Sequence, residues 1–154
     1  MPSPKVLVIM GSKSDQPTML KGIEILKEFK IPYRMEICSA HRNPEKTKSL
    51  AKSAEKKGVK VIIAGAGMAA HLPGVIASHT NLPVIGVPLN ASPLSGIDSL
   101  FSIVQMPPGV PVATVSIGEA GAKNAAILAI QILALSDERL KKKLEKFKQH
   151  LAEK

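Results

Sequence analysis

Two residues with complementary chemistry stand side by side in the turn Ser39-Ala40-His41-Arg42. Histidine takes up and releases a proton near neutral pH, and the arginine guanidinium is a permanently charged fork that suits a phosphate. The turn follows residues 33–38, whose alternation is typical of a strand. No apolar periodicity accounts for this polar cluster, so we predict that Ser39, His41 and Arg42 serve a ligand.

A second polar turn, Gly11-Ser12-Lys13-Ser14-Asp15, follows the short apolar run 6–10. Glycine permits a tight departure from a strand, and serine hydroxyls beside a helix N-terminus can bind a phosphate. Asp15 could accept hydrogen bonds from ribose hydroxyls. Alternatively, Ser14 or Asp15 only caps the following helix, and this turn taken alone leaves both interpretations open.

A third turn, at residues 65–71, is rich in glycine and alanine and ends in His71. Small residues let the backbone approach a flat ligand closely and offer it main-chain donors and acceptors. The segment lacks the glycine spacing of a dinucleotide site, and no Gly-Lys-Ser/Thr follows, which excludes a P-loop. His71 either contacts the ligand or anchors the loop, whereas we assign no chemistry to His79 and His150.

Other kinds of catalytic centre find no support in the sequence. The chain has one cysteine, no His-x-x-x-His pair and no carboxylate cluster at ligand spacing, so we predict no metal site. The Gly-x-Ser-x-Gly elbow of serine hydrolases is also absent. Proton transfer by His41 on an anionic ligand is the chemistry that these residues favour.

Composition narrows the partners and the compartment. The formal charge is +9, but aromatic residues make up only 3% of the chain, which leaves little for nucleic-acid bases to stack on. We therefore attribute the charge to solubility and to attraction for an anionic small molecule. Cys38 has no disulfide partner, there is no secretory signal, and the longest apolar stretch, 125–135, is too short to span a bilayer. These features predict a soluble, cytoplasmic protein that binds neither nucleic acid nor membrane.

Strand and helix patterns alternate along the chain, which predicts one α/β domain over 1–154 with a parallel sheet and helices on both faces. The expected strands are 6–10, 33–38, 61–64, 84–87 and 112–115, and the expected helices include 43–57, 72–78, 96–104 and 122–135. All three polar or glycine-rich turns follow strands. They should therefore meet at the carboxyl edge of the sheet, where ligands bind in such folds.

The last segment, 136–154, reads as an additional amphipathic helix. Leu140, Leu144, Phe147 and Leu151 recur at helical spacing on one side, and charged residues fill the other. Such a stripe either docks on the body of its own chain or on a neighbouring subunit, and the sequence leaves both possibilities open.

The three turns together closely resemble the PurE family of purine biosynthesis. The motifs are Gly-Ser-Lys-Ser-Asp at 11–15, Ser-Ala-His-Arg at 39–42 and Gly-Ala-Gly-Met-Ala-Ala-His-Leu-Pro-Gly at 65–74, and segments 87–89, 99–107 and 121–126 also fit. The resemblance runs from about residue 5 to residue 135 and leaves out the C-terminal helix. It implies a flavodoxin-like three-layer αβα fold, a homo-octamer, and no metal or organic cofactor.

The resemblance also implies an activity and a set of site residues. The activity is isomerisation of 5-(carboxyamino)imidazole ribonucleotide, in which a carboxylate moves from the exocyclic nitrogen to a ring carbon. His41 falls at the family's catalytic histidine, and Ser12, Asp15 and Arg42 fall at substrate-binding positions. Further positions that line the same pocket correspond to Ser14, Ser39, Ala40, Gly67, His71 and Leu72.

Two other functions remain as alternatives. A second branch of the family carboxylates aminoimidazole ribonucleotide directly with carbon dioxide, but it typically carries Lys after Ser-Ala-His, where this chain has Arg42. From another class, a flavodoxin-like module could bind a nucleotide without catalysis. Two residues depart from the family pattern: Met68 stands where relatives usually have Gly, and Asn43 replaces a usual Thr, a nearly equivalent helix cap.

Overall fold

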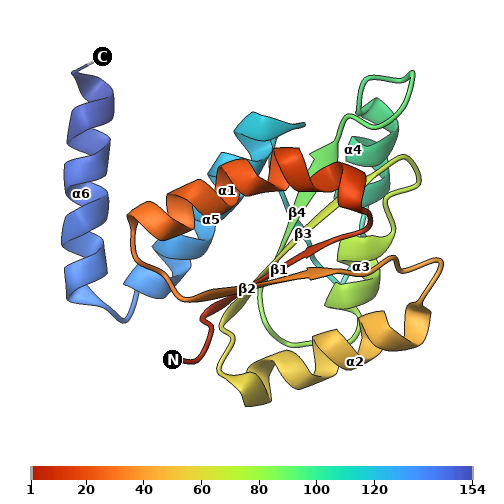
Figure 1. The fold of residues 1–154 in the computed structure, drawn as a ribbon, viewed down its shortest axis with the longest axis horizontal. Coiled ribbons are helices and arrows are strands. Elements are labelled where there is room, and N and C mark those ends of the chain that lie inside the picture. The colour runs from red at the N-terminus through yellow and green to blue at the C-terminus, as the bar shows by residue number, and fades with distance from the viewer. Residues whose placement is uncertain (1, 154) are drawn as a thin grey trace.

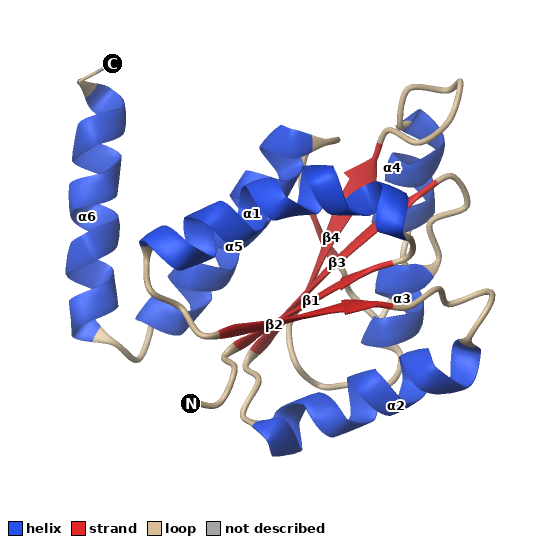
Figure 2. Ribbon diagram, in the orientation of Figure 1, coloured by secondary structure: helices blue, strands red, loops and turns tan. Residues whose placement is uncertain are grey.

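The computed structural model describes residues 2–153 and contains a five-stranded sheet between two layers of helices (Figures 1 and 2). The strands run parallel in the order β2-β1-β3-β4-β5. The predicted flavodoxin-like α/β fold is therefore confirmed. The strands are β1 (Val6–Met10), β2 (Tyr33–Ile37), β3 (Val61–Gly67), β4 (Val84–Leu89) and β5 (Ala113–Thr114).

Helices cover both faces of the sheet. They are α1 (Gln16–Glu28), α2 (Pro44–Ala54), α3 (Leu72–Ala77), α4 (Ile97–Val104), α5 (Glu119–Ala134) and α6 (Glu138–Ala152), with short 3₁₀ turns at Lys13–Asp15 and Glu55–Lys57. In Figure 1, α1 and α5 lie on one face, and α2, α3 and α4 lie on the other. None of the helices in the described part of the chain is long and apolar enough to cross a membrane.

The alternation of side chains along the strands divides the core into two clusters. Val6, Val8 and Met10 of β1 pack with α1 and α5, whereas Leu7 and Ile9 belong to the cluster on the face of α2 and α3. Successive residues of a strand point to opposite faces, so a central strand that is covered on both sides must be apolar throughout. All five residues of β1 are accordingly buried.

The boundaries of several elements differ from the prediction. β3 and β4 extend beyond 61–64 and 84–87, because Gly65, Ala66 and Gly67 remain paired with β4 residues. The first part of the expected glycine-rich turn is thus strand. β5 contains only two residues rather than four, and α5 begins at Glu119 rather than at residue 122. The helix expected over 43–57 is α2 followed by a 3₁₀ turn, and Gly58 ends it with a left-handed φ of 91°.

Helix α6 stands beyond α1 and α5 at one side of the molecule (Figure 1). Leu140 and Leu144 are buried in the same cluster as residues of α1 and α5. Phe147 meets Phe29 edge-on, with 5.5 Å between ring centroids. Leu151 near the end of α6 is 53% exposed, so the apolar stripe is only partly covered by its own chain.

Candidate active site

The loops after β1, β2 and β3 meet at the carboxyl edge of the sheet and surround a cavity of about 570 Å³. They meet because β1 lies between β2 and β3 in the sheet, so its loop is adjacent to both others. Every site residue expected from the sequence lines this cavity: Ser12, Ser14, Asp15, Ser39, Ala40, His41, Arg42, Gly67, His71 and Leu72. Topology thus gathers residues that are up to 60 positions apart, between Ser12 and Leu72.

His41 and His71 form a pair across the cavity. Nε2 of His41 lies 2.5 Å from Nδ1 of His71, and the rings meet edge-on with centroids 4.6 Å apart. One nitrogen must donate its proton to the other, so the tautomer of each ring constrains that of its partner. His71 precedes α3 directly, and its position there fixes one side of the pair. Both side chains are exposed, which leaves them accessible to a ligand.

Arg42 ties the loop after β2 to the loop after β1. Its Nη2 donates a hydrogen bond to the Gly11 carbonyl at 3.1 Å, and its backbone N–H donates to Ser39 Oγ at 3.2 Å. The first bond uses one of the five N–H groups of the guanidinium, so donors remain for an anion. The cavity therefore has a fixed cation on the same loop as His41.

Asp15 is the buried carboxylate of the site, with 8% of the residue exposed. Its Oδ2 accepts a hydrogen bond from the Ser12 backbone N–H at 3.0 Å, and Ser12 Oγ accepts one from the Ser14 backbone N–H at 3.3 Å. Burial raises the pKa of Asp15, while backbone hydrogen bonds at Ser12 and Gly11 and the charge of Arg42 oppose that rise. Ser12 and Asp15 form a capping box, so the capping interpretation holds at this turn whether or not a ligand also binds there.

The end of β3 forms a wall of small residues with one exception. A Cβ on Gly67 would lie 2.5 Å from the Cβ of Ala91, so only glycine fits there. Met68 follows with a φ of 54°, a left-handed conformation that costs other residues energy and glycine none, and its side chain is 58% exposed. The backbone at this position is therefore one that glycine adopts freely, and Met68 holds it at a cost.

Ala91 is a lining residue that sequence reasoning missed. It follows β4, which ends at the same edge of the sheet as the three loops already singled out. The position of Ala91 along the chain could have indicated its place in the site. The segment after the fourth expected strand reaches the same edge of the sheet as the segments after the first three strands. Small apolar side chains carry no chemical signature of their own.

A smaller cavity of about 430 Å³ adjoins the first and shares Gly11, Ser12, Ser39 and Arg42 with it. Lys13 and Lys46 add positive charge to its lining. Lys46 Nζ lies 3.6 Å from Glu36 Oε2, so that cation is partly neutralised. The edge of the site next to Arg42 is nonetheless basic, which suits a phosphate.

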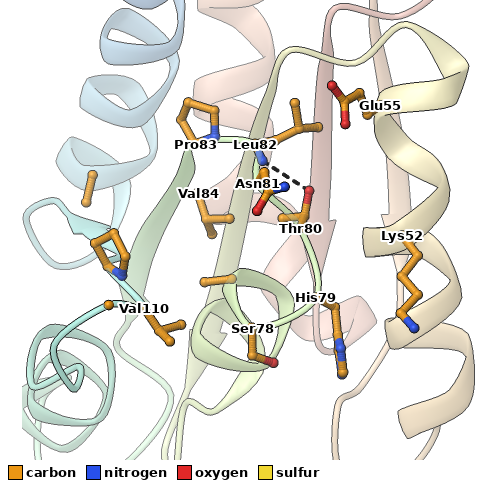
Figure 3. A pocket seen from close by; sticks show the side chains of 14 residues that line it. Lys52, Glu55, Ser78, His79, Thr80, Asn81, Leu82, Pro83, Val84 and Val110 are labelled. Atoms are coloured by element: carbon orange, nitrogen blue, oxygen red, sulfur yellow. Dashed lines mark hydrogen bonds between the residues drawn. The ribbon is translucent and has the colours of Figure 1, made fainter.

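The remaining two histidines, His79 and His150, lie outside the cavity that His41 lines. His150 is on α6, where Nδ1 bonds to the Lys146 carbonyl at 2.7 Å. His79 lines a cavity of about 960 Å³ at the opposite, amino edge of the sheet, together with Lys52 of α2 and Glu55 of the 3₁₀ turn that follows it (Figure 3). Within residues 2–153, no group of three or more His, Cys, Asp or Glu side chains is arranged to hold a metal ion.

Comparison with known proteins gives a consistent result. The family model described as AIR carboxylase matches residues 5–154, which includes the C-terminal helix that the motif resemblance left out. The N5-carboxyaminoimidazole ribonucleotide mutase of Saccharolobus solfataricus is 60% identical over 148 residues, covering 96% of this chain and 92% of that protein. The protein of the same name from Escherichia coli K12 is 56% identical over 140 residues, covering 91% and 83%.

The fold comparison agrees. The crystal structure of Treponema denticola PurE superposes with a TM-score of 0.87 at 30% identity, covering 97% of this chain and 92% of that one. The family model and the superposition each cover almost the whole chain, and the motifs of the three loops lie within the matched residues. The chain belongs to the AIR carboxylase, or PurE, family.

Proposed function

We propose that this chain is a mutase that converts 5-(carboxyamino)imidazole ribonucleotide into 4-carboxy-5-aminoimidazole ribonucleotide in purine biosynthesis. The observation that carries the proposal is the junction of the His41–His71 pair with a cationic edge at Arg42, in one cavity at the carboxyl end of the sheet. Relatives of 54–60% identity bear the name of this activity. An isomerase needs no second substrate, and one cavity suffices for it.

The reaction moves one carboxylate and one proton in opposite directions. The carbamate C–N bond breaks, carbon dioxide leaves, and the exocyclic nitrogen takes up a proton. The ring carbon then bonds to the carbon dioxide and carries both a proton and the new carboxylate, until loss of that proton restores aromaticity. His41 would deliver the first proton and remove the second, so that the enzyme ends in its starting protonation state.

His71 would hold the ring of His41 in place for both transfers. The 2.5 Å contact fixes which nitrogen of His41 faces His71 and leaves Nδ1 of His41 free of that contact. A proton-transfer group contributes most when its orientation is set before the substrate reacts. His71 therefore has the role of a positioning residue in this mechanism.

The other lining residues would bind and orient the ribonucleotide. We assign the phosphate to Arg42 and Ser12 and a ribose hydroxyl to Asp15, with Ser14, Ser39, Ala40, Gly67 and Leu72 completing the wall. A site that keeps the freed carbon dioxide beside the ring carbon turns recapture into a nearly intramolecular step. The small apolar residues at the end of β3 suit that task because they offer water no side-chain hydrogen bonds and leave room for the ligand.

We further propose that residues 1–154 form a single domain in a cytoplasmic homo-octamer that needs no metal or organic cofactor. The family resemblance supports these points. The basic surface, with a formal charge of +9, would also attract an anionic ribonucleotide.

The experiment that tests this proposal traces the carbamate carbon of the substrate into the product. Substrate with a labelled carbamate carbon should give product that keeps the label in unlabelled bicarbonate buffer, after correction for uncatalysed decay of the carbamate. A direct carboxylase would draw on dissolved carbon dioxide and dilute the label to background, and complete washout would establish that alternative. Binding of the ribonucleotide without turnover would instead indicate a non-catalytic module.

A further inference from the structure

Met68 is a large apolar side chain that is exposed at the active-site cavity. Among the described residues that line this cavity, two have large apolar side chains, Met68 and Leu72. Leu72 is 3% exposed and belongs to the core cluster on the face of α2 and α3, whereas Met68 is 58% exposed. The other lining residues are polar, alanine or glycine. A flexible thioether therefore lies at the rim of a cavity that is otherwise polar or lined by small residues.

The backbone at Met68 is left-handed, with a φ of 54°. Lys30 has a similar φ of 59°, and the reason there is local, because the residue ends α1. The Ile31 N–H donates to the Leu26 carbonyl at 2.8 Å, a bond that helices commonly form beyond a left-handed residue. Met68 ends no helix, since it follows β3 and leads three residues later to His71. Strained residues of this kind cluster at sites where the strain serves a function.

We infer that Met68 covers the imidazole ring of the bound ribonucleotide and thereby keeps carbon dioxide beside it. The inference rests on the proposed mutase reaction, in which carbon dioxide is free between leaving the nitrogen and joining the ring carbon. A methionine sulfur contacts aromatic rings favourably, and its unbranched side chain adapts to the surface that it covers. Carbon dioxide is small and apolar, so an apolar cover retains it better than a polar one.

The other exposed residues of the cavity do not suit this task. His41, Arg42 and His71 are exposed polar side chains, with proposed roles in proton transfer, phosphate binding and positioning. Ala69 is exposed as well, but its side chain is too short to reach over a ligand. Recapture is nearly intramolecular only while bond formation is faster than escape from the site. Met68 combines the length and the apolar character that slow such an escape.

The first experiment measures how much of the transferred carbon escapes. Substrate with a labelled carbamate carbon reacts in unlabelled bicarbonate, and mass spectrometry of the product gives the ratio of lost to retained label, corrected for uncatalysed decay. Met68→Ala should raise this ratio about two- to ten-fold, which corresponds to the loss of one sulfur–aromatic contact. Met68→Leu should keep the ratio near that of wild type, because leucine preserves the apolar volume. The control is Leu135→Ala, which truncates an 88% exposed leucine between α5 and α6 and should not change the ratio.

The second experiment tests the cover without turnover. Hydrogen peroxide oxidises accessible methionine to the sulfoxide, and peptide mass spectrometry follows each methionine separately. Oxidation of Met68 should slow by about three-fold or more when the product ribonucleotide fills the site, because the ligand takes the place of solvent around the sulfur. Met35 of β2, which is half-buried and does not line the cavity, is the internal control and should oxidise at an unchanged rate.

Two results would overturn the inference directly: a wild-type chain and a Met68→Ala variant that retain label equally well, or oxidation of Met68 that the ribonucleotide does not slow. A lower mass of the Met68→Ala variant in light scattering would also overturn it, because Met68 would then serve a contact between subunits. Complete washout of label from the wild-type chain, with Met68 still protected by the ribonucleotide, would count against the mutase reaction and support the cover.

Discussion

A cavity lies at each end of the parallel strands, one at the carboxyl edge of the sheet and one at the amino edge, and different kinds of residues line the two. The cavity at the amino edge is the larger, about 960 Å³ against 570 Å³ at the carboxyl edge. At the carboxyl edge, side-chain contacts join residues 30 and 31 positions apart, in the pairs His41–His71 and Arg42–Gly11. At the amino edge, the hydrogen bond drawn in Figure 3 joins Thr80 and Leu82, two positions apart. Volume is therefore a poor guide to chemistry, whereas contacts that hold distant loops together are a good one.

The largest expected effect belongs to His41→Asn. If the carboxyl edge is the reaction centre, turnover should fall by about 10²–10⁴-fold, the usual worth of a general acid–base group. Ribonucleotide affinity should stay within a few-fold, because proton transfer and not binding is removed. Steady-state kinetics and calorimetric titration with the product measure the two quantities. Near-normal turnover would remove His41 from the mechanism and break the contrast between the two edges.

Arg42→Ala should have the next largest effect. Loss of a charge-assisted contact to phosphate costs about 1.5–3 kcal/mol, which corresponds to roughly ten- to a hundred-fold weaker binding. The affinity for the nucleoside without phosphate should not change, which makes the nucleoside the control ligand. Equal losses for both ligands would show that the bond from Arg42 to the Gly11 carbonyl supports the loops instead.

Asp15→Asn should change the way stability depends on pH. Because burial raises the pKa of Asp15 above its ordinary value of 3.8, the folded chain favours the protonated acid. Its contribution to stability is present below that value and is lost as the pH rises through the folded-state pKa. Relative to wild type, the Asp15→Asn variant should therefore gain stability as the pH rises from 3.8 through the folded-state pKa of Asp15. Urea denaturation across that range measures it, and Glu24→Gln, at an exposed carboxylate, serves as a control. If the difference in unfolding free energy between Asp15→Asn and wild type does not change with pH, the pKa of Asp15 is not raised in the folded chain.

Sequence patterns predicted the fold and the edge of the sheet where the three turns meet, because both depend on the order of strands and helices along the chain. Alternating strands and helices imply a parallel sheet, and a parallel sheet brings its carboxyl ends together. The length of β5 could not be predicted in this way. It lies at the edge of the sheet, pairs on one side only, and follows Pro111, which has no N–H to donate.

Contacts within the site were also beyond the reach of the sequence. The contact between His71 and His41 depends on the strand order, in which β1 separates β2 from β3, and on the position of α3. Neither feature can be read from the two histidines or their neighbours in the sequence. Sequence reasoning left His71 between a ligand contact and a loop anchor. The structure places it against the catalytic candidate, a third possibility.

Met68→Gly is expected to have a small effect on stability. Relief of a left-handed φ is worth about 1–2 kcal/mol, and the greater freedom of glycine in the unfolded chain offsets about 0.4–1 kcal/mol of it. The free energy of unfolding should therefore rise by about 1 kcal/mol or less. Met68→Ala is the matched control, because it removes the side chain and keeps the strain. If Met68→Gly is less stable in urea than Met68→Ala by about 0.4–1 kcal/mol, the full entropic cost of glycine, then the φ of 54° carries no cost and the cavity wall is not strained there.

His79→Ala should have the smallest effect, and it tests the comparison from the other side. His79 lines the larger cavity, near Lys52 of α2, and a histidine beside a lysine in a large hollow could be mistaken for an anion site (Figure 3). The surrounding segment reaches none of the loops that carry His41, Arg42 or Asp15, because it lies where the strands begin and not where they end. Both kcat/KM and ribonucleotide affinity should accordingly remain within about two-fold of wild type, roughly the scatter of such measurements. A ten-fold loss in either quantity, with an unchanged mass and melting temperature, would mean that the amino edge takes part in the reaction.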